Sequence, residues 1–164
     1  MYWVTRAGVR LDRVACAWLI LRHIDPQATL AYLDNAALVG AIAEGALPFH
    51  NTVSEDPETT VEPEAEERTS FSLLLAEYKL DQSDPALVLF SDIIAGAEIK
   101  PSEAVPEAAG VLAIAKGMTA LAASDEERVA RMAPVFDALY AYCWRRVRGQ
   151  VQWANEPLQA VPAK

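Results

Sequence analysis

The segment from Asp12 to Pro26 predicts a helix that is apolar on nearly every side, and it constrains the fold more than any other feature of the chain. Apolar residues recur there at helical spacing, and further apolar residues fill the flanks. They are Val14, Ala15, Cys16, Ala17, Trp18, Leu19, Ile20, Leu21 and Ile24. A helix of this kind is buried, so the rest of the chain is expected to surround it. Asp12 stands in the position of an N-cap, and Asp25-Pro26 ends the helix.

Short strands are expected around this helix, and further helices dominate the remainder of the chain. Aromatic and β-branched residues predict strands at 2–5 and 29–33, and 47–50 predicts an edge strand because it contains Pro48. Apolar periodicity and helix start signals predict helices at 36–44, 71–78, 85–95, 106–121 and 128–148. The expected fold is α+β and mostly α-helical, with a small N-terminal β-sheet of about three strands packed against about six helices.

The chain has the length of a single domain with its own core, at 164 residues. We expect residues 1–149 to form that domain and residues 150–164 to form a C-terminal tail. Between them, residues 51–67 contain many acids and two prolines but no apolar period. This composition predicts a solvated, disordered acidic loop, and a functional lid is the alternative for a loop of this length.

Charge and cysteine content exclude several classes of function. The formal net charge is -9 and the sequence pI is about 4.7, so direct nucleic-acid binding is not expected, because contact with phosphates needs a basic face. No apolar run is long enough to span a membrane, and the first residues lack the pattern of a secretory signal. Cys16 and Cys143 lie in apolar helical patterns without CxxC spacing, which indicates reduced thiols. A cytoplasmic protein is therefore expected.

Positive charge is concentrated at the start of the apolar helix. Arg6, Arg10 and Arg13 lead into it, with Asp12 among them. Helix N-termini attract anions, and guanidinium groups bind tetrahedral oxyanions through paired hydrogen bonds. The pattern is therefore a candidate anion site. The alternative is that Arg13 pairs with Asp12 or another acid while the other two arginines are solvated.

Candidates for a metal site or a nucleophile are fewer. The chain has two histidines and no ligand spacing typical of zinc. His23 follows Arg22 at a helix end, where a structural role is expected. His50 opens the acidic loop and could bind a divalent ion together with a carboxylate of Glu62, Glu64 or Glu67. Cys16 is expected in the core rather than as a nucleophile.

Four blocks of the sequence resemble the C-terminal domain family of the chromate-resistance protein ChrB. They are DRVACAWLILRHIDP (12–26), RTSFSLLLAEYKLDQSDPAL (68–87), PEAAGVLAIAKGMTAL (106–121) and FDALYAYC (136–143). The blocks follow the order of the family and extend over most of the chain. The resemblance implies a bacterial cytoplasmic protein connected with the response to chromate. In two-domain members a separate N-terminal region is linked to transcriptional regulation, and no segment here corresponds to it, so direct nucleic-acid binding is not carried over.

The sequence departs from the family pattern at two blocks. A family histidine before the Ser-Phe pair aligns with Glu64, and the acid after the phenylalanine aligns with Ser72. In a second block the family has a histidine or arginine followed by an aspartate, where this chain reads IIAGAE and ends at Glu98. If relatives use these positions for a metal or for acid–base chemistry, Glu64 and Glu98 would keep two oxygen ligands but no imidazole.

Three hypotheses follow. The first is a non-enzymatic or weakly active domain that binds chromate or a sulfate-like oxyanion near Arg6, Arg10, Asp12 and Arg13. The second is a metal-dependent enzyme in which His50, Glu64 and Glu98 hold a divalent metal cofactor. The third is an interaction module that binds a protein partner or forms a homo-oligomer. Its aromatic candidates near the C-terminal end are Tyr142, Trp144 and Trp153.

Overall fold

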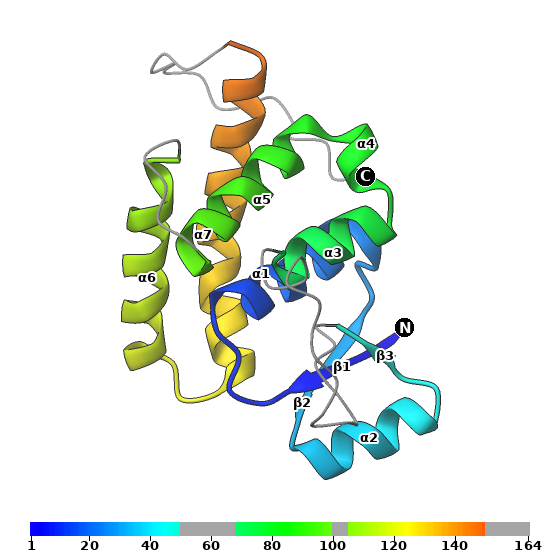
Figure 1. Cartoon of the computed structure of the whole chain (residues 1–164). Coiled ribbons are helices and arrows are strands. Elements are labelled where there is room, and N and C mark those ends of the chain that lie inside the picture. The colour runs from blue at the N-terminus through cyan, green and yellow to red at the C-terminus, as the bar shows by residue number, and fades with distance from the viewer. Residues whose placement is uncertain (50–67, 100–104, 150–164) are drawn as a thin grey trace.

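The computed structural model describes residues 1–49, 68–99 and 105–149 (Figure 1). The predicted acidic loop at 51–67 and the predicted tail at 150–164 therefore lie outside the described residues. The elements are β1 (Tyr2–Arg6), α1 (Leu11–Leu19), the π-helix η1 (Ile20–Ile24), β2 (Thr29–Leu33), α2 (Asn35–Ala43), β3 (Leu47–Pro48), α3 (Ser70–Glu77), α4 (Leu80–Ser83), α5 (Pro85–Glu98), α6 (Glu107–Leu121) and α7 (Asp125–Val147). The predicted α+β fold, mostly helical with a small N-terminal sheet, is confirmed.

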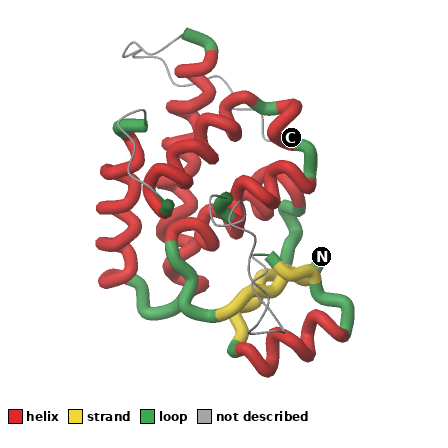
Figure 2. The backbone as a smooth tube through the Cα atoms, viewed as in Figure 1, coloured by secondary structure: helices red, strands yellow, loops and turns green. Residues whose placement is uncertain are grey.

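The sheet is parallel, with β1 between β2 and β3. Successive side chains of β1 point to opposite faces. Trp3 belongs to the large core that contains α1, whereas Val4 packs with Leu38 and Ala46 in a small cluster beside α2. The two crossover helices thus cover opposite faces of the sheet. Figure 2 shows the strands gathered toward one end of the molecule, with α2 below them and the other helices above.

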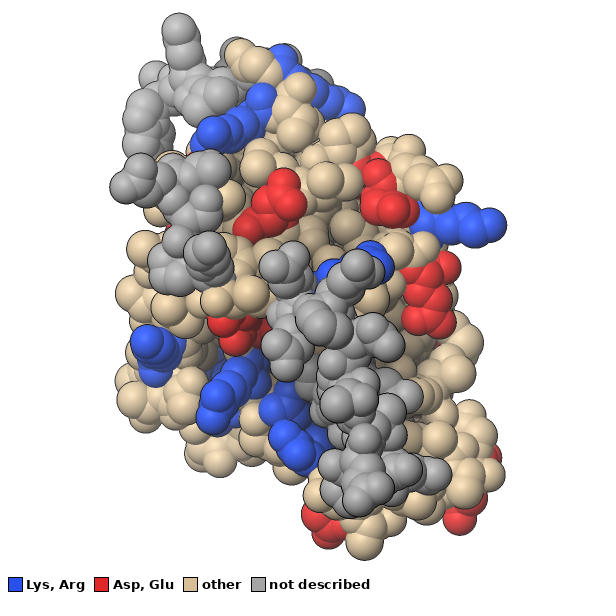
Figure 3. Space-filling view, in the orientation of Figure 1, with Lys and Arg blue, Asp and Glu red and all other residues tan. Residues whose placement is uncertain are grey.

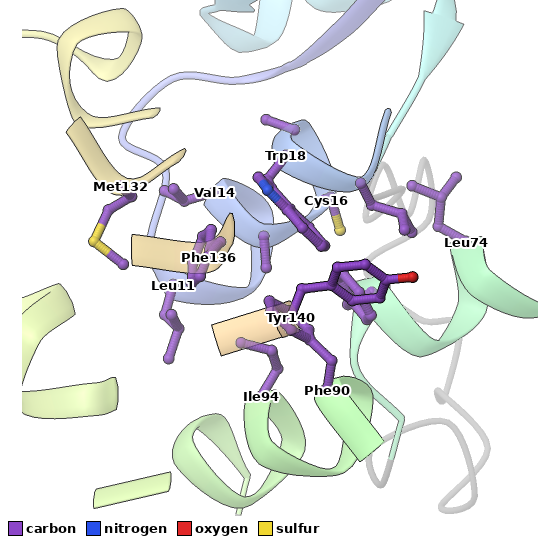
Figure 4. Close-up of a cluster of buried hydrophobic side chains, with 14 of the residues drawn as sticks. Leu11, Val14, Cys16, Trp18, Leu74, Phe90, Ile94, Met132, Phe136 and Tyr140 are labelled. Atoms are coloured by element: carbon purple, nitrogen blue, oxygen red, sulfur yellow. The ribbon is translucent and has the colours of Figure 1, made fainter. Parts of the chain in front are cut away.

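The apolar helix is central, as its sequence predicted. Every residue of α1 except Asp12 is buried, and Trp18 is the aromatic centre of the surrounding core. The Trp18 ring stacks on Phe90 of α5 at 4.8 Å between centroids and lies 5.8 Å from Tyr140 of α7 (Figure 4). Its Nε1 donates to Oδ1 of Asp137 at 2.8 Å. The core therefore joins α1, α5 and α7 through one indole ring.

The end of the apolar helix differs from the regular helix that the sequence predicted. Residues Ile20–Ile24 form a π-helical turn, and the backbone N–H of Asp25 donates to the carbonyl of Ile20 at 2.7 Å. Asp25 also accepts from the N-terminal amino group at 2.6 Å and from Nε1 of Trp3 at 3.3 Å. The wider turn thus ends where Asp25 is bonded to the start of β1. Within the described part of the chain, no helix has the length and apolar character that crossing a membrane requires.

His23 should make the stability of the protein depend on pH. Its ring packs edge-on against Trp18 and Tyr140. Burial lowers the pKa of His23 below its ordinary value of 6.5, and Arg22 lowers this pKa further, while Asp84 and Asp137 act in the opposite direction. The imidazole of His23 therefore binds a proton more readily in the unfolded chain than in the folded protein.

The contribution of His23 is fully present above about pH 6.5 and is lost as the pH falls below that value. Urea denaturation at about pH 7.5 and about pH 5.5 should therefore show a smaller free energy of unfolding at the lower pH. His23→Phe keeps an aromatic ring and should reduce this loss. An equal loss in the variant would assign the pH dependence to other groups.

Candidate functional site

The connection from β1 to α1 is held by side chains from two helices. The backbone N–H groups of Gly8 and Val9 donate to the two carboxylate oxygens of Asp125, at 2.7 Å and 3.1 Å. The carbonyl of Val9 accepts from Nη1 of Arg128 at 2.7 Å. Gly8 has a φ of +77°, a left-handed conformation in which a side chain would be strained. These bonds satisfy the polar backbone of the turn and fix its course over the first turn of α7.

Arg13 fixes the same connection from the side of α1. Its Nη1 donates to the carbonyl of Arg6 at 2.5 Å, and its Nη2 donates to the carbonyl of Gly8 at 2.8 Å. The residue is 8% exposed, and burial lowers the pKa of its guanidinium, with the neighbouring charge of Arg6 as the next cause. The sequence left open whether Arg13 faces an anion or pairs with an acid. Its hydrogen bonds here go to backbone carbonyl oxygens.

The prediction that Asp12 is the N-cap of its own helix is wrong. The helix begins at Leu11, and its N-cap residue, Arg10, makes no side-chain capping bond. The carboxylate of Asp12 instead accepts from the backbone N–H groups of Ser70 and Phe71, both at 2.9 Å. These are the first residues of α3, whose N–H groups have no partner within the helix. Asp12 therefore caps a neighbouring helix and ties α3 to α1.

Glu98 supplies the carboxylate at the start of α1. Its Oε1 accepts from the backbone N–H of Asp12 at 3.1 Å, which brings the C-terminal end of α5 to the N-terminal end of α1. A negative side chain is favourable at this positive end of a helix. A carboxylate of the chain itself therefore lies at the helix end that the sequence predicted as an anion site.

A pocket of about 340 Å³ lies at this junction. It brings together all four residues predicted for the anion site and Glu98. Its lining is formed by Arg6, Ala7, Gly8, Arg10, Asp12, Arg13 and Glu98. Arg6 and Arg10 are exposed, and within the described part of the chain neither forms an ion pair. Figure 3 shows basic side chains gathered at the lower left of this face, with an acidic group among them.

The metal hypothesis rests mainly on residues outside the described part of the chain. Glu98 lies in the pocket, but His50 and Glu64 are not among the described residues. Within residues 1–49, 68–99 and 105–149, no three His, Cys, Asp or Glu side chains are grouped closely enough to hold a metal ion. A divalent metal at His50, Glu64 and Glu98 stays a prediction.

The other candidate residues have local contacts. The hydroxyl of Tyr142 donates to Glu107, and the guanidinium of Arg148 lies 3.5 Å above the ring of Trp144. Trp153 lies outside the described residues. Cys16 and Cys143 are buried, and burial raises the pKa of the Cys143 thiol to about 12 and that of Cys16 as well. Both thiols are therefore protonated at neutral pH, which fits the predicted core role of Cys16.

Sequence reasoning missed two residues that shape the site, Asp125 and Arg128. Both lie in the first turns of α7, and the bonds of Asp125 to the turn after β1 cross 116 and 117 residues of sequence. The only local signal was the run of acids at 125–127, which is typical of a helix start. That signal explains the helix but gives no information on the distant loop that Asp125 binds.

Comparison with known proteins gives consistent matches. The family model described as the C-terminal domain of ChrB matches residues 3–143. The protein ChrB of Cupriavidus metallidurans is 33% identical over 140 residues, which are 85% of this chain and 40% of that relative. The chain thus spans less than half the length of the curated relative that it matches. No solved structure shows a significant match.

Proposed function

The chain belongs to the ChrB C-terminal domain family, and from this premise we propose that it takes part in chromate resistance by binding a small tetrahedral oxyanion, chromate or a sulfate-like ion. The ligand would lie in the pocket between Arg6 and Arg10. The observation that carries the proposal is that both exposed arginines line one pocket beside the first turn of α1. Each guanidinium offers the forked donors that suit tetrahedral oxyanions.

The position of the pocket in the sheet supports the proposal. β1 is the central strand of a parallel sheet, and its crossover helices cover opposite faces. In open parallel sheets ligands bind outside the carboxyl ends of the strands, where the strand order reverses. The pocket begins at Arg6, the last residue of β1, and thus lies beyond the carboxyl end of the central strand.

The roles of the arginines differ in this proposal. Arg6 and Arg10 contact the oxyanion, while Arg13 holds the carbonyl oxygens of Arg6 and Gly8 and so sets the shape of the turn. Glu98 opposes binding, because its carboxylate already accepts from the backbone N–H of Asp12 at the helix end that the ligand would approach. The site therefore combines attraction from two exposed arginines with repulsion from Glu98 and from Asp12, which also lines the pocket.

Thermal melting with sulfate, molybdate and chromate tests the proposal. Sulfate and molybdate are included because they do not oxidise thiols. An oxyanion at about a hundred times its Kd should stabilise the fold by about 2.7 kcal/mol, which is a rise in Tm of roughly 5–10 °C. Arg10→Ala should abolish the rise. Arg148→Ala is the matched control, because α7 has 23 residues and Arg148 lies about 30 Å from its first turn.

Glu98→Gln supplies a variant with the opposite expected effect. It removes the repelling charge and keeps the shape of the side chain, so oxyanion affinity should rise about threefold to tenfold at low ionic strength. Calorimetric titration with sulfate measures the change. A rise in Tm that survives Arg10→Ala, or an affinity that is unaltered by Glu98→Gln, would contradict this placement of the ligand.

A further inference from the structure

A second cavity, of about 460 Å³, adjoins the proposed anion pocket. It lies between the turn after β1 and α6, and much of its wall is aliphatic. The lining residues that carry the argument are Val9, Leu11, Leu112, Ala115, Lys116 and Arg128. Val9 and Leu11 are buried in the core, while Leu112 and Ala115 are partly buried on α6. An inorganic oxyanion would make no use of these apolar side chains.

The two cavities adjoin and share part of their walls, and we call them together the groove. Gly8, Arg10 and Glu98 line both of them. The groove therefore has a cationic end at Arg6 and Arg10 and an aliphatic end between Leu11 and Leu112. Lys116 adds a further positive charge along the aliphatic end. This order of charge and apolar surface suits a ligand with an anionic group at one end and a hydrocarbon group at the other.

The lining also limits the kind of substituent. Among the residues that the structure describes, no aromatic side chain lines either cavity, so none of them offers a partner for stacking of a planar ring.

We propose that the groove binds an organic oxyanion, a phosphonate, phosphate ester or sulfonate that carries a short aliphatic substituent. The oxyanion group contacts Arg6 and Arg10, and the substituent lies against Leu112 and Ala115. The inference rests on the proposed anion site and names the class of ligand that fills the whole groove.

Calorimetric titration of the intact chain with phosphate and with methyl-, propyl- and pentylphosphonate tests the inference. Each methylene moved from water to the aliphatic wall should tighten binding about fourfold, which corresponds to about 0.8 kcal/mol. Propylphosphonate should thus bind more than tenfold more tightly than methylphosphonate. Binding of phosphate with no gain along the series would overturn the inference and leave the anion site intact. Failure of phosphate and of every phosphonate to bind would overturn both proposals.

Two substitutions on α6 locate the substituent. Ala115→Trp fills the aliphatic cavity and should remove the gain with chain length while phosphate still binds. Ala113→Trp is the matched control, since Ala113 is exposed on the same helix and lines neither cavity. The control should keep the fourfold gain per methylene. A gain that persists in Ala115→Trp would overturn the assignment of this cavity.

Discussion

Replacing Asp125 with alanine should lower the free energy of unfolding by about 3–5 kcal/mol, a large share of the stability of a single domain. Its carboxylate accepts hydrogen bonds from two backbone N–H groups of the turn after β1. It also forms an ion pair with Nη1 of Arg128 at 2.7 Å. The side chains of this pair are only 11% and 14% exposed. Removing the carboxylate leaves a buried positive charge and two backbone donors without partners, which is the costly way to break such a pair.

Chemical denaturation followed by circular dichroism measures this effect, with Glu126→Ala as the control. Glu126 lies in the same first turn of α7 and is exposed, so its replacement should change the free energy of unfolding by less than about 1 kcal/mol. A double variant with Arg128→Met should recover part of the loss, because no buried charge then remains uncompensated. A loss in Asp125→Ala no larger than in Glu126→Ala would show that the turn does not depend on this carboxylate.

Local pattern was sufficient for the central helix and the sheet. A helix with Trp18 on one side and Leu19 and Ile20 on another has no polar face. Such a helix is buried, whichever segments of the chain pack around it. Pro48 likewise limited its strand to an edge, since proline lacks the N–H that a central strand needs. Among the described residues, β3 lies at the edge of the sheet and pairs with β1. These features depend on residues close together in the sequence.

The candidate site was harder to predict from the sequence, because its hydrogen bonds connect segments that are far apart in the chain. An aspartate just before an apolar helical pattern can cap its own helix or the start of another helix. The same sequence pattern is compatible with both arrangements. Asp12 caps α3 across 58 residues, and Glu98 reaches α1 across 86. The sequence also predicted Glu98 as a metal ligand. The structure places Glu98 in the proposed anion pocket, and its role as a metal ligand stays a prediction. Long-range pairing of this kind leaves no periodic trace in the sequence.

Substitutions of Arg13 and Arg10 distinguish an arginine that stabilises the turn after β1 from an arginine that contacts the ligand. Arg13→Ala should lower the free energy of unfolding by about 2–4 kcal/mol, because two partly buried carbonyl oxygens lose charged donors. Arg10→Ala, at an exposed position, should change stability by no more than about 0.5 kcal/mol while abolishing oxyanion binding. Arg13→Lys keeps the charge but lacks the fork that spans both carbonyls, so it should recover only part of the stability. Denaturation curves and sulfate titrations of the three variants are compared at a temperature where all are folded. Loss of sulfate binding in Arg13→Ala with unchanged stability would instead assign Arg13 to the ligand and leave the turn to Asp125 and Arg128.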